Sequence, residues 1–114
     1  MVTKISNKKQ LILGLKKQLT TRPERALLAL QRLYEFQLED DRDEARGKHR
    51  NGRGFDRLDR EILTFFAEQL LKNKSLSEKH MRIIFRRIPK YAGQLIENSI
   101  SSGLIRKEGK FYTW

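Results

Sequence analysis

Five carboxylates are gathered within six positions of the sequence, from Glu39 to Glu44. Clustered carboxylates are the ligands that a hard cation such as Mg²⁺ prefers, so a magnesium-dependent nuclease would hold its metal here. Helical spacing, however, places Asp40, Asp43 and Glu44 on one side of a helix and points the remaining acids elsewhere. We therefore interpret the cluster as a solvated helix end and expect no metal ion.

No other residue types are spaced as a catalytic site requires. The chain has two histidines, His49 and His80, and no cysteine, which are too few ligands for a zinc site. The glycine-containing stretch 51–54 lacks the G-K-[ST] ending and the preceding strand of a phosphate-binding P-loop. The backbone amides of Gly52 and Gly54 could hold one phosphate, although a sharp turn between helices explains the same glycines. We predict that the chain is not an enzyme and uses no cofactor.

Positive charge is the clearest functional signal. The sequence has 25 lysines and arginines against 14 acids, a net charge of +11. One group of cations lies between two helical stretches, and in a second group residues 79, 82, 86 and 90 follow one continuous helix face opposite Ile84 and Ile88. The first group is Arg46, Lys48, Arg50 and Arg53, and the second is Lys79, Arg82, Arg86, Arg87 and Lys90.

This surplus predicts a polyanionic partner, because cations that neutralise phosphates release condensed counterions. We predict non-enzymatic binding of nucleic acid, mainly duplex DNA held through its phosphates, with an affinity that falls steeply as salt is added. An anionic lipid surface, an acidic protein and solubility alone are alternative explanations. The charge does not distinguish DNA from RNA, and it does not define an oligomeric state.

A different class of function uses the acidic helix instead. Residues 24–45 hold seven acids and three cations, whereas the rest of the chain is basic. In this hypothesis the chain is a protein-interaction module, such as a helicase adaptor or a small inhibitor of a host protein, and any exposed part of Phe36 and Phe111 contributes to its surface. The residues assigned to this surface are Glu39, Asp40, Asp43, Glu44, Tyr112 and Trp114.

Hydrophobic periodicity predicts the helices that position these side chains. A first helix is expected over about residues 7–19. A second begins at a capping box that runs from Thr21 to Glu24, with Pro23 in its first turn, and continues to about residue 45.

Two further start signals follow the basic loop. Asp56 is predicted to cap a third helix by accepting the N–H of Asp59, with Phe55 as the preceding staple residue, and this helix ends near residue 72. An S-x-x-E pattern that begins at Ser75 predicts the start of a fourth helical stretch from residue 78.

Pro89 and the C-terminal tail determine the remaining architecture. An interior proline removes a helix hydrogen bond, so a kink or a break is expected, and a break would give two helices over 78–87 and 90–101. The tail predicts a short hairpin that turns at K-E-G-K. Helix, turn, helix and hairpin is the order of a winged-helix DNA-binding unit; the alternative is a helical bundle with an irregular C-terminal strap. We therefore predict one mainly α domain over residues 1–114, compact, with four or five helices and a flexible basic start at residues 1–6.

Several short motifs together resemble a known module. They are Gln37 with the acids at 40–44, Asn51-Gly52-x-Gly54-Phe55-x-x-x-Asp59, Leu76-Ser77-x-Lys79 and Lys90-Tyr91-x-x-Gln94-Leu95. This pattern, over about residues 21–95, resembles a small module of phage and mobile-element proteins that often lies beside or within superfamily 2 helicases and primase-like replication proteins. The resemblance implies a DNA-metabolism setting, with a helicase or another replication protein as a partner. This chain has no helicase motor, and Pro89 interrupts what is usually one continuous helix.

Hydropathy bears on the location of the chain. The sequence has no apolar run near the roughly 18 residues of a membrane span, and its first apolar stretch is too short for a secretory signal. We expect a cytoplasmic protein without a membrane partner.

Overall fold

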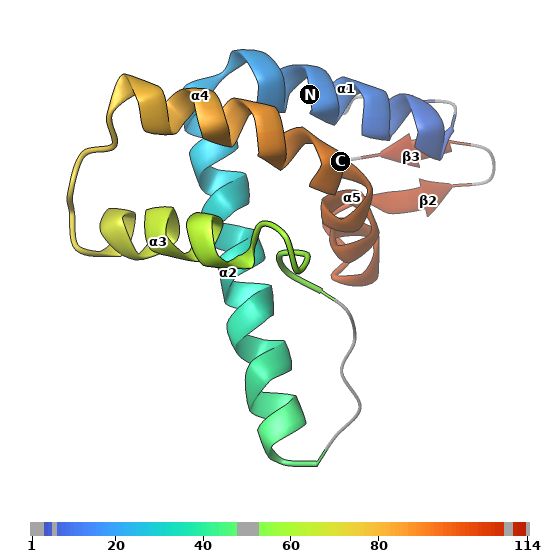
Figure 1. Ribbon diagram of the computed structural model, residues 1–114. Helices are drawn as coiled ribbons and strands as arrows, with labels where there is room; N and C mark the ends of the chain where they lie inside the picture. The colour runs from blue at the N-terminus through green and yellow to red at the C-terminus, as the bar shows by residue number, and fades with distance from the viewer. Residues whose placement is uncertain (1–3, 6, 48–52, 109–110, 114) are drawn as a thin grey trace.

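Helices make up most of the fold. The computed structural model describes residues 4–5, 7–47, 53–108 and 111–113. Within these ranges five α-helices follow one another, and a 3₁₀ helix, η1, joins the last two (Figure 1). Their bounds are α1 Lys8–Thr21, α2 Pro23–Ala45, α3 Arg60–Leu71, α4 Glu78–Arg87, η1 Ile88–Tyr91 and α5 Ala92–Ser101. The prediction of a mainly α-helical domain is confirmed.

The core is built around α2, which contacts α1, α3, α4 and η1. The C-terminal part of α2 extends away from the other helices (Figure 1). Every element that packs on α2 contributes aliphatic or aromatic side chains with almost no exposed surface. The largest of them are Leu19, Leu30, Leu33, Phe36, Leu63, Phe66, Ile84 and Ile88.

The junction between α1 and α2 corrects one predicted cap. The hydroxyl of Thr21 donates to the carbonyl of Lys17 at 2.8 Å, so it closes the last turn of α1 instead of capping α2. Arg22 occupies the N-cap position of α2 and makes no side-chain cap hydrogen bond. Pro23 is the first residue of α2, where its missing N–H leaves no hydrogen bond unmade.

Helix α4 starts at Glu78 as predicted, but its cap lies two residues after the predicted one. Ser77, not Ser75, is the N-cap, and its hydroxyl accepts the backbone N–H of His80 at 3.1 Å. The His80 Nδ1 accepts the backbone N–H of Ser77 in return, which completes a capping box with histidine in the position usually held by glutamate. The His80 ring also packs against Phe65 and Phe66 of α3, so tertiary packing selects this cap.

Pro89 breaks the helix, which is one of the two outcomes predicted for it. Helix α4 ends at Arg87, η1 carries the chain through the proline, and α5 starts at Ala92. The predicted continuous basic face is therefore wrong in its last member, because Lys90 lies on the 3₁₀ helix and not on α4. The change of helical pitch turns Lys90 toward the start of α3, as its ion pairs show.

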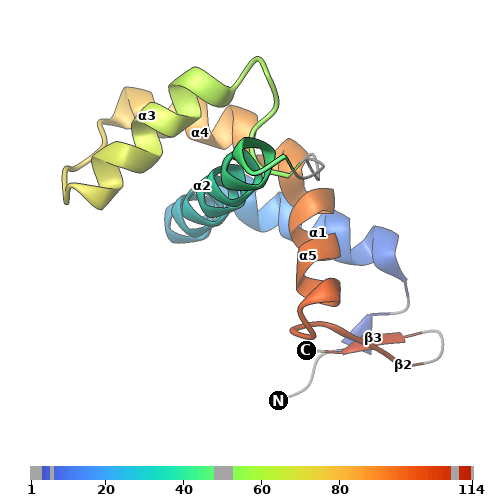
Figure 2. The ribbon, with the colours of Figure 1, turned by 90° about the horizontal axis from the view of Figure 1, so that it is seen from below.

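A small sheet brings the two ends of the described chain together. Strand β1 (Lys4–Ile5) pairs antiparallel with β3 (Phe111–Thr113), which also pairs with β2 (Arg106–Glu108), so the order is β1-β3-β2. Lys4 and Ile5 thus differ from the flexible start that was expected for residues 1–6. The sheet and α3 lie at opposite ends of the molecule (Figure 2).

Candidate nucleic-acid interface

The exposed face of α4 carries three of the predicted binding residues. Lys79, Arg82 and Arg86 are all exposed, while Ile84 on the opposite face has no exposed surface. Arg82 lies 3.8 Å from Glu78, an ion pair between two largely exposed side chains that contributes little. Among the residues that the structure describes, Lys79 and Arg86 form no ion pair. The charge of this face is therefore available to a partner.

Arg87 and Lys90, by contrast, bind carboxylates within the protein. Arg87 lies 2.5 Å from Asp59, and the Lys90 ammonium lies 2.6 Å from both Asp59 and Asp56. The side chain of Asp59 has no exposed surface. Two cations and two carboxylates balance each other here, so this cluster adds no net charge to a binding surface.

Tyr91 completes this cluster. Its hydroxyl donates to the Asp59 carboxylate at 2.7 Å and accepts the backbone N–H of Asp56 at 2.9 Å. Its ring packs edge-on against Phe55, with ring centroids 6.2 Å apart. The predicted bond from the N–H of Asp59 to the Asp56 carboxylate is present at 3.1 Å, although α3 itself begins at Arg60. We call Asp56, Asp59, Arg87, Lys90 and Tyr91 the Asp59 cluster.

Contacts within the Asp59 cluster shift the pKa values of Asp56, Asp59, Lys90 and Tyr91. Burial alone would raise the pKa of Asp59, but hydrogen bonds from Lys90, Tyr91 and Arg87 outweigh it and lower that pKa. The hydrogen bond from Lys90 lowers the pKa of Asp56, and the same carboxylates raise the pKa of Lys90. Burial raises the pKa of the Tyr91 hydroxyl, so it remains a donor. Near neutral pH the cluster thus holds two anions, two cations and a neutral phenol.

The first predicted group of cations also contains both an exposed cation and a cation that is paired within the protein. Arg46 is exposed just after α2, whereas Lys48 and Arg50 lie outside the described residues. The guanidinium of Arg53 lies 3.2 Å from Asp40 and 2.9 Å from Glu39, and the backbone N–H of Arg53 also donates to Asp40 at 2.8 Å. Arg53 is thus bound to α2, and its charge is more than balanced.

Both backbone polar groups of Gly54 are hydrogen-bonded within the fold, so its amide is not free to bind a phosphate. Its N–H donates to the side-chain oxygen of Gln94 at 2.6 Å, and its carbonyl accepts the Gln94 amide at 3.1 Å. Its φ is +91°, and a Cβ at this position would lie 2.9 Å from the backbone of Gln37. The phosphate-cradle hypothesis therefore does not hold for Gly54, while Gly52 lies outside the described residues.

The acidic end of α2 has a packing role as well. Asp40 is fully buried against Arg53, and Asp41 lies 2.8 Å from Arg60 of the next helix. No group of side chains within the described ranges could hold a metal ion. Glu39, Asp43 and Glu44 keep exposed surface, but burial of Asp40 removes it from any partner surface.

Of the aromatic residues proposed for the protein-interaction surface, one is buried and the side chains of the others are outside what the structure describes. Phe36 is 2 % exposed, so it belongs to the core and cannot contact a partner. Phe111 and Tyr112 belong to β3, where the structure describes the backbone pairing only. Trp114 and His49 lie outside the described residues.

Helix α1 supplies cations that are not among the predicted binding residues. Lys9, Lys16 and Lys17 are exposed, and α1 contains no acidic residue. Helix α1 contacts α4 where the two helices overlap in Figure 1. The signal was present in the sequence, because residues 1–23 hold cations and no acid.

Comparisons with protein-family models, with curated proteins and with solved structures found no match. Within the described part of the chain, no helix has the length and apolar character that crossing a bilayer requires.

Proposed function

We propose that the chain binds duplex DNA without catalysis, mainly through phosphate contacts from the exposed cations of α4 and α1. The observation that carries the proposal is the exposed face of α4, where Lys79, Arg82 and Arg86 lie without a strong internal partner. Cations that are not neutralised within the fold are the ones that can replace counterions on a phosphate backbone.

The neighbouring helix supports this proposal. Lys16 and Lys17 lie on a helix with no acid of its own, and α1 contacts α4. Two adjoining basic helices offer a broader field than one helix, and such a field steers a polyanion toward the protein.

Duplex DNA is proposed over single strands because the described surface offers several cations, whereas Phe65 of α3, 49 % exposed and packed against His80, is the one aromatic side chain in the described residues that is largely exposed, and successive stacked bases need more than one. Phe36 and Phe55 are buried, and Tyr91 is bound within the Asp59 cluster. A phage or mobile-element setting, with a helicase or replication protein as a partner, stays a prediction from the resemblance.

A winged-helix mode of binding receives less support than simple phosphate contact. In the winged-helix order, α5 would hold the position of the recognition helix, directly before the β2–β3 strands. Helix α5 has no lysine or arginine, and its one charged residue, Glu97, pairs with Lys8 of α1. The proposed contacts therefore come from α4 and not from α5.

Fluorescence anisotropy with a labelled duplex tests the proposal. The three phosphate contacts of α4 alone predict roughly a 40-fold loss of affinity between about 50 and 200 mM salt, and contacts from α1 would add to it. The triple variant Lys79→Gln, Arg82→Gln, Arg86→Gln should bind at least about a hundredfold more weakly at the lower salt, with a log–log salt slope smaller by about 3.

The matched control removes three exposed cations from other parts of the chain, as Arg42→Gln, Arg57→Gln, Lys72→Gln. It changes the net charge equally and should lose less than threefold in affinity. Binding that ignores salt, or an equal loss in both triple variants, would contradict a site on α4. Tighter binding of a single strand than of the duplex would replace the proposed substrate.

A further inference from the structure

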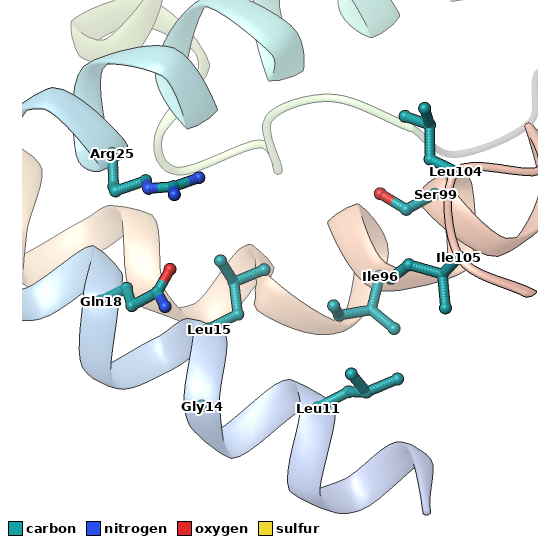
Figure 3. A pocket seen from close by; sticks show the side chains of 9 residues that line it. All are labelled: Leu11, Gly14, Leu15, Gln18, Arg25, Ile96, Ser99, Leu104 and Ile105. Atoms are coloured by element: carbon teal, nitrogen blue, oxygen red, sulfur yellow. The ribbon is translucent and has the colours of Figure 1, made fainter. Parts of the chain in front are cut away.

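A second candidate site lies away from the cations of α4, between α1, α5 and the segment that leads into β2. It is an open groove of about 470 Å³, which is within the range of small-molecule pockets (Figure 3). Five aliphatic side chains form its floor and far end, namely Leu11, Leu15, Ile96, Leu104 and Ile105. Leu104 is 67 % exposed at the rim, so apolar surface is open to solvent here.

One charged side chain lines this groove. Arg25 points toward the open space from the start of α2, at the opposite side from Leu104 (Figure 3). Within the described part of the chain, Arg25 forms no ion pair, and no carboxylate lines the groove. Gln18 and Ser99 add polar groups to the lining. The groove thus combines an apolar wall with a single cationic end.

Gly14 provides an independent observation. It lies inside α1, where glycine is a poorer helix former than any residue except proline. Its backbone does not have a positive φ, and a Cβ at this position would meet no atom within 4 Å. Neither backbone conformation nor packing within the described fold explains the glycine. It does line the groove, where a larger side chain would occupy the open space.

We propose that this groove binds a small amphiphilic carboxylate, with its hydrocarbon chain along α1 and α5 and its carboxylate on Arg25. A protein partner fits less well, because a stable interface takes about 20–30 residues on each side and this groove has 9. Charge complementarity selects an anion, because Arg25 is the one charged group in the lining.

Decanoate, kept below its micelle concentration, is the probe that tests this site. Titration followed by ¹H–¹⁵N correlation spectra should give saturable shifts at Leu11, Leu15 and Ile96, with a Kd on the order of 100 µM. Butyrate, which lacks the chain, and decyltrimethylammonium, which reverses the charge, should each bind at least tenfold more weakly. Equal binding of decanoate and decyltrimethylammonium would overturn the assigned role of Arg25.

Two variants separate binding from folding. Gly14→Leu should fill the groove and weaken decanoate binding at least tenfold, while the better helix former raises the Tm by about 4 °C. Arg25→Gln should weaken decanoate binding about tenfold without changing the Tm. Leu13→Ala is the control, since Leu13 is exposed on the same helix but does not line the groove, and it should bind normally.

Two further results would overturn the proposal. One is unchanged decanoate affinity in Gly14→Leu, and the other is binding that occurs with phosphatidylglycerol vesicles but not with monomeric decanoate. The proposal is independent of DNA binding, because it uses none of the three exposed cations of α4. The triple variant at positions 79, 82 and 86 should therefore bind decanoate like the original chain.

Discussion

Arg86 and Arg87 are neighbours in the chain but belong to two different regions of the molecule. Arg86 is exposed on α4, and among the described residues it has no ion-pair partner. Arg87 lies 2.5 Å from Asp59, whose side chain is completely buried. The exposed face of α4 and the Asp59 cluster thus contain the same types of cation with opposite consequences. A cation that is balanced inside the fold stabilises the fold, and an unbalanced one is available to a polyanion.

The Asp59 cluster holds together parts of the chain that are distant in sequence. It joins the turn before α3 to the end of α4 and to η1 through the carboxylate of Asp59 and the hydroxyl of Tyr91. Gly54 and Gln94 make a second connection close by, between the same loop and α5. If these contacts are structural, changing them should alter stability far more than DNA affinity.

Replacing Asp59 should have the largest effect. Asp59→Asn removes the negative charge that Arg87 and Lys90 share and weakens the acceptor of the Tyr91 hydroxyl. We expect the free energy of unfolding to fall by about 3 kcal/mol, measured by urea titration. Asp43→Asn, at a partly exposed position of α2, should change it by less than about 0.5 kcal/mol. Similar values for the two variants would show that the cluster does not stabilise the fold.

Gly54 should be the next most sensitive position. Gly54→Ala imposes a positive φ on alanine and drives its Cβ against the backbone of Gln37, so we expect a loss of about 2 kcal/mol. Gly47→Ala is the matched control, because Gly47 also has a positive φ of +77° but open space around it. It should lose only about 1 kcal/mol, and the difference measures the contact with Gln37. Equal losses would mean that this close contact carries no strain.

The pH dependence of stability should also reveal the contribution of the Asp59 cluster, as a smaller effect. Because the pKa of Asp59 is lower in the folded state, its stabilising contribution is fully present above its unfolded pKa of about 3.9. That contribution is lost as the pH falls through the folded pKa. The stability difference between the original chain and Asp59→Asn should therefore be constant from about pH 5 to 7 and shrink below about pH 4. Urea titrations across this range check it, and a difference that stays constant to pH 2 would assign the stabilisation to packing.

The helices could be predicted from the sequence because their signals are local. Periodic apolar residues, Pro23 and Pro89 define where α1, α2 and the break after α4 occur, and none of these depends on distant residues. The capping serine of α4 was less predictable, because the choice of Ser77 depends on where α3 places His80.

The candidate site was predictable only in part. Charge and spacing identify cations but treat Arg86 and Arg87 alike, since the partner of Arg87 lies 28 residues earlier in the chain. The motifs contained information that residue spacing alone did not. Gly54 and Asp59 belong to one motif, and in the structure they contact Gln94 and Tyr91, which belong to another. These two contacts join residues that lie 40 and 32 positions apart in the chain.

The most direct test of the account is the duplex affinity of Arg86→Gln and Arg87→Gln, measured side by side at about 50 mM salt and at a temperature where both are folded. The two variants lose the same charge from adjacent positions. We predict that Arg86→Gln binds the duplex roughly tenfold more weakly with unchanged stability, because one phosphate contact is lost. Arg87→Gln should stay within about twofold of the original affinity but unfold about 1–2 kcal/mol more easily. An Arg87→Gln variant that loses as much affinity as Arg86→Gln would contradict the division between structural and binding cations.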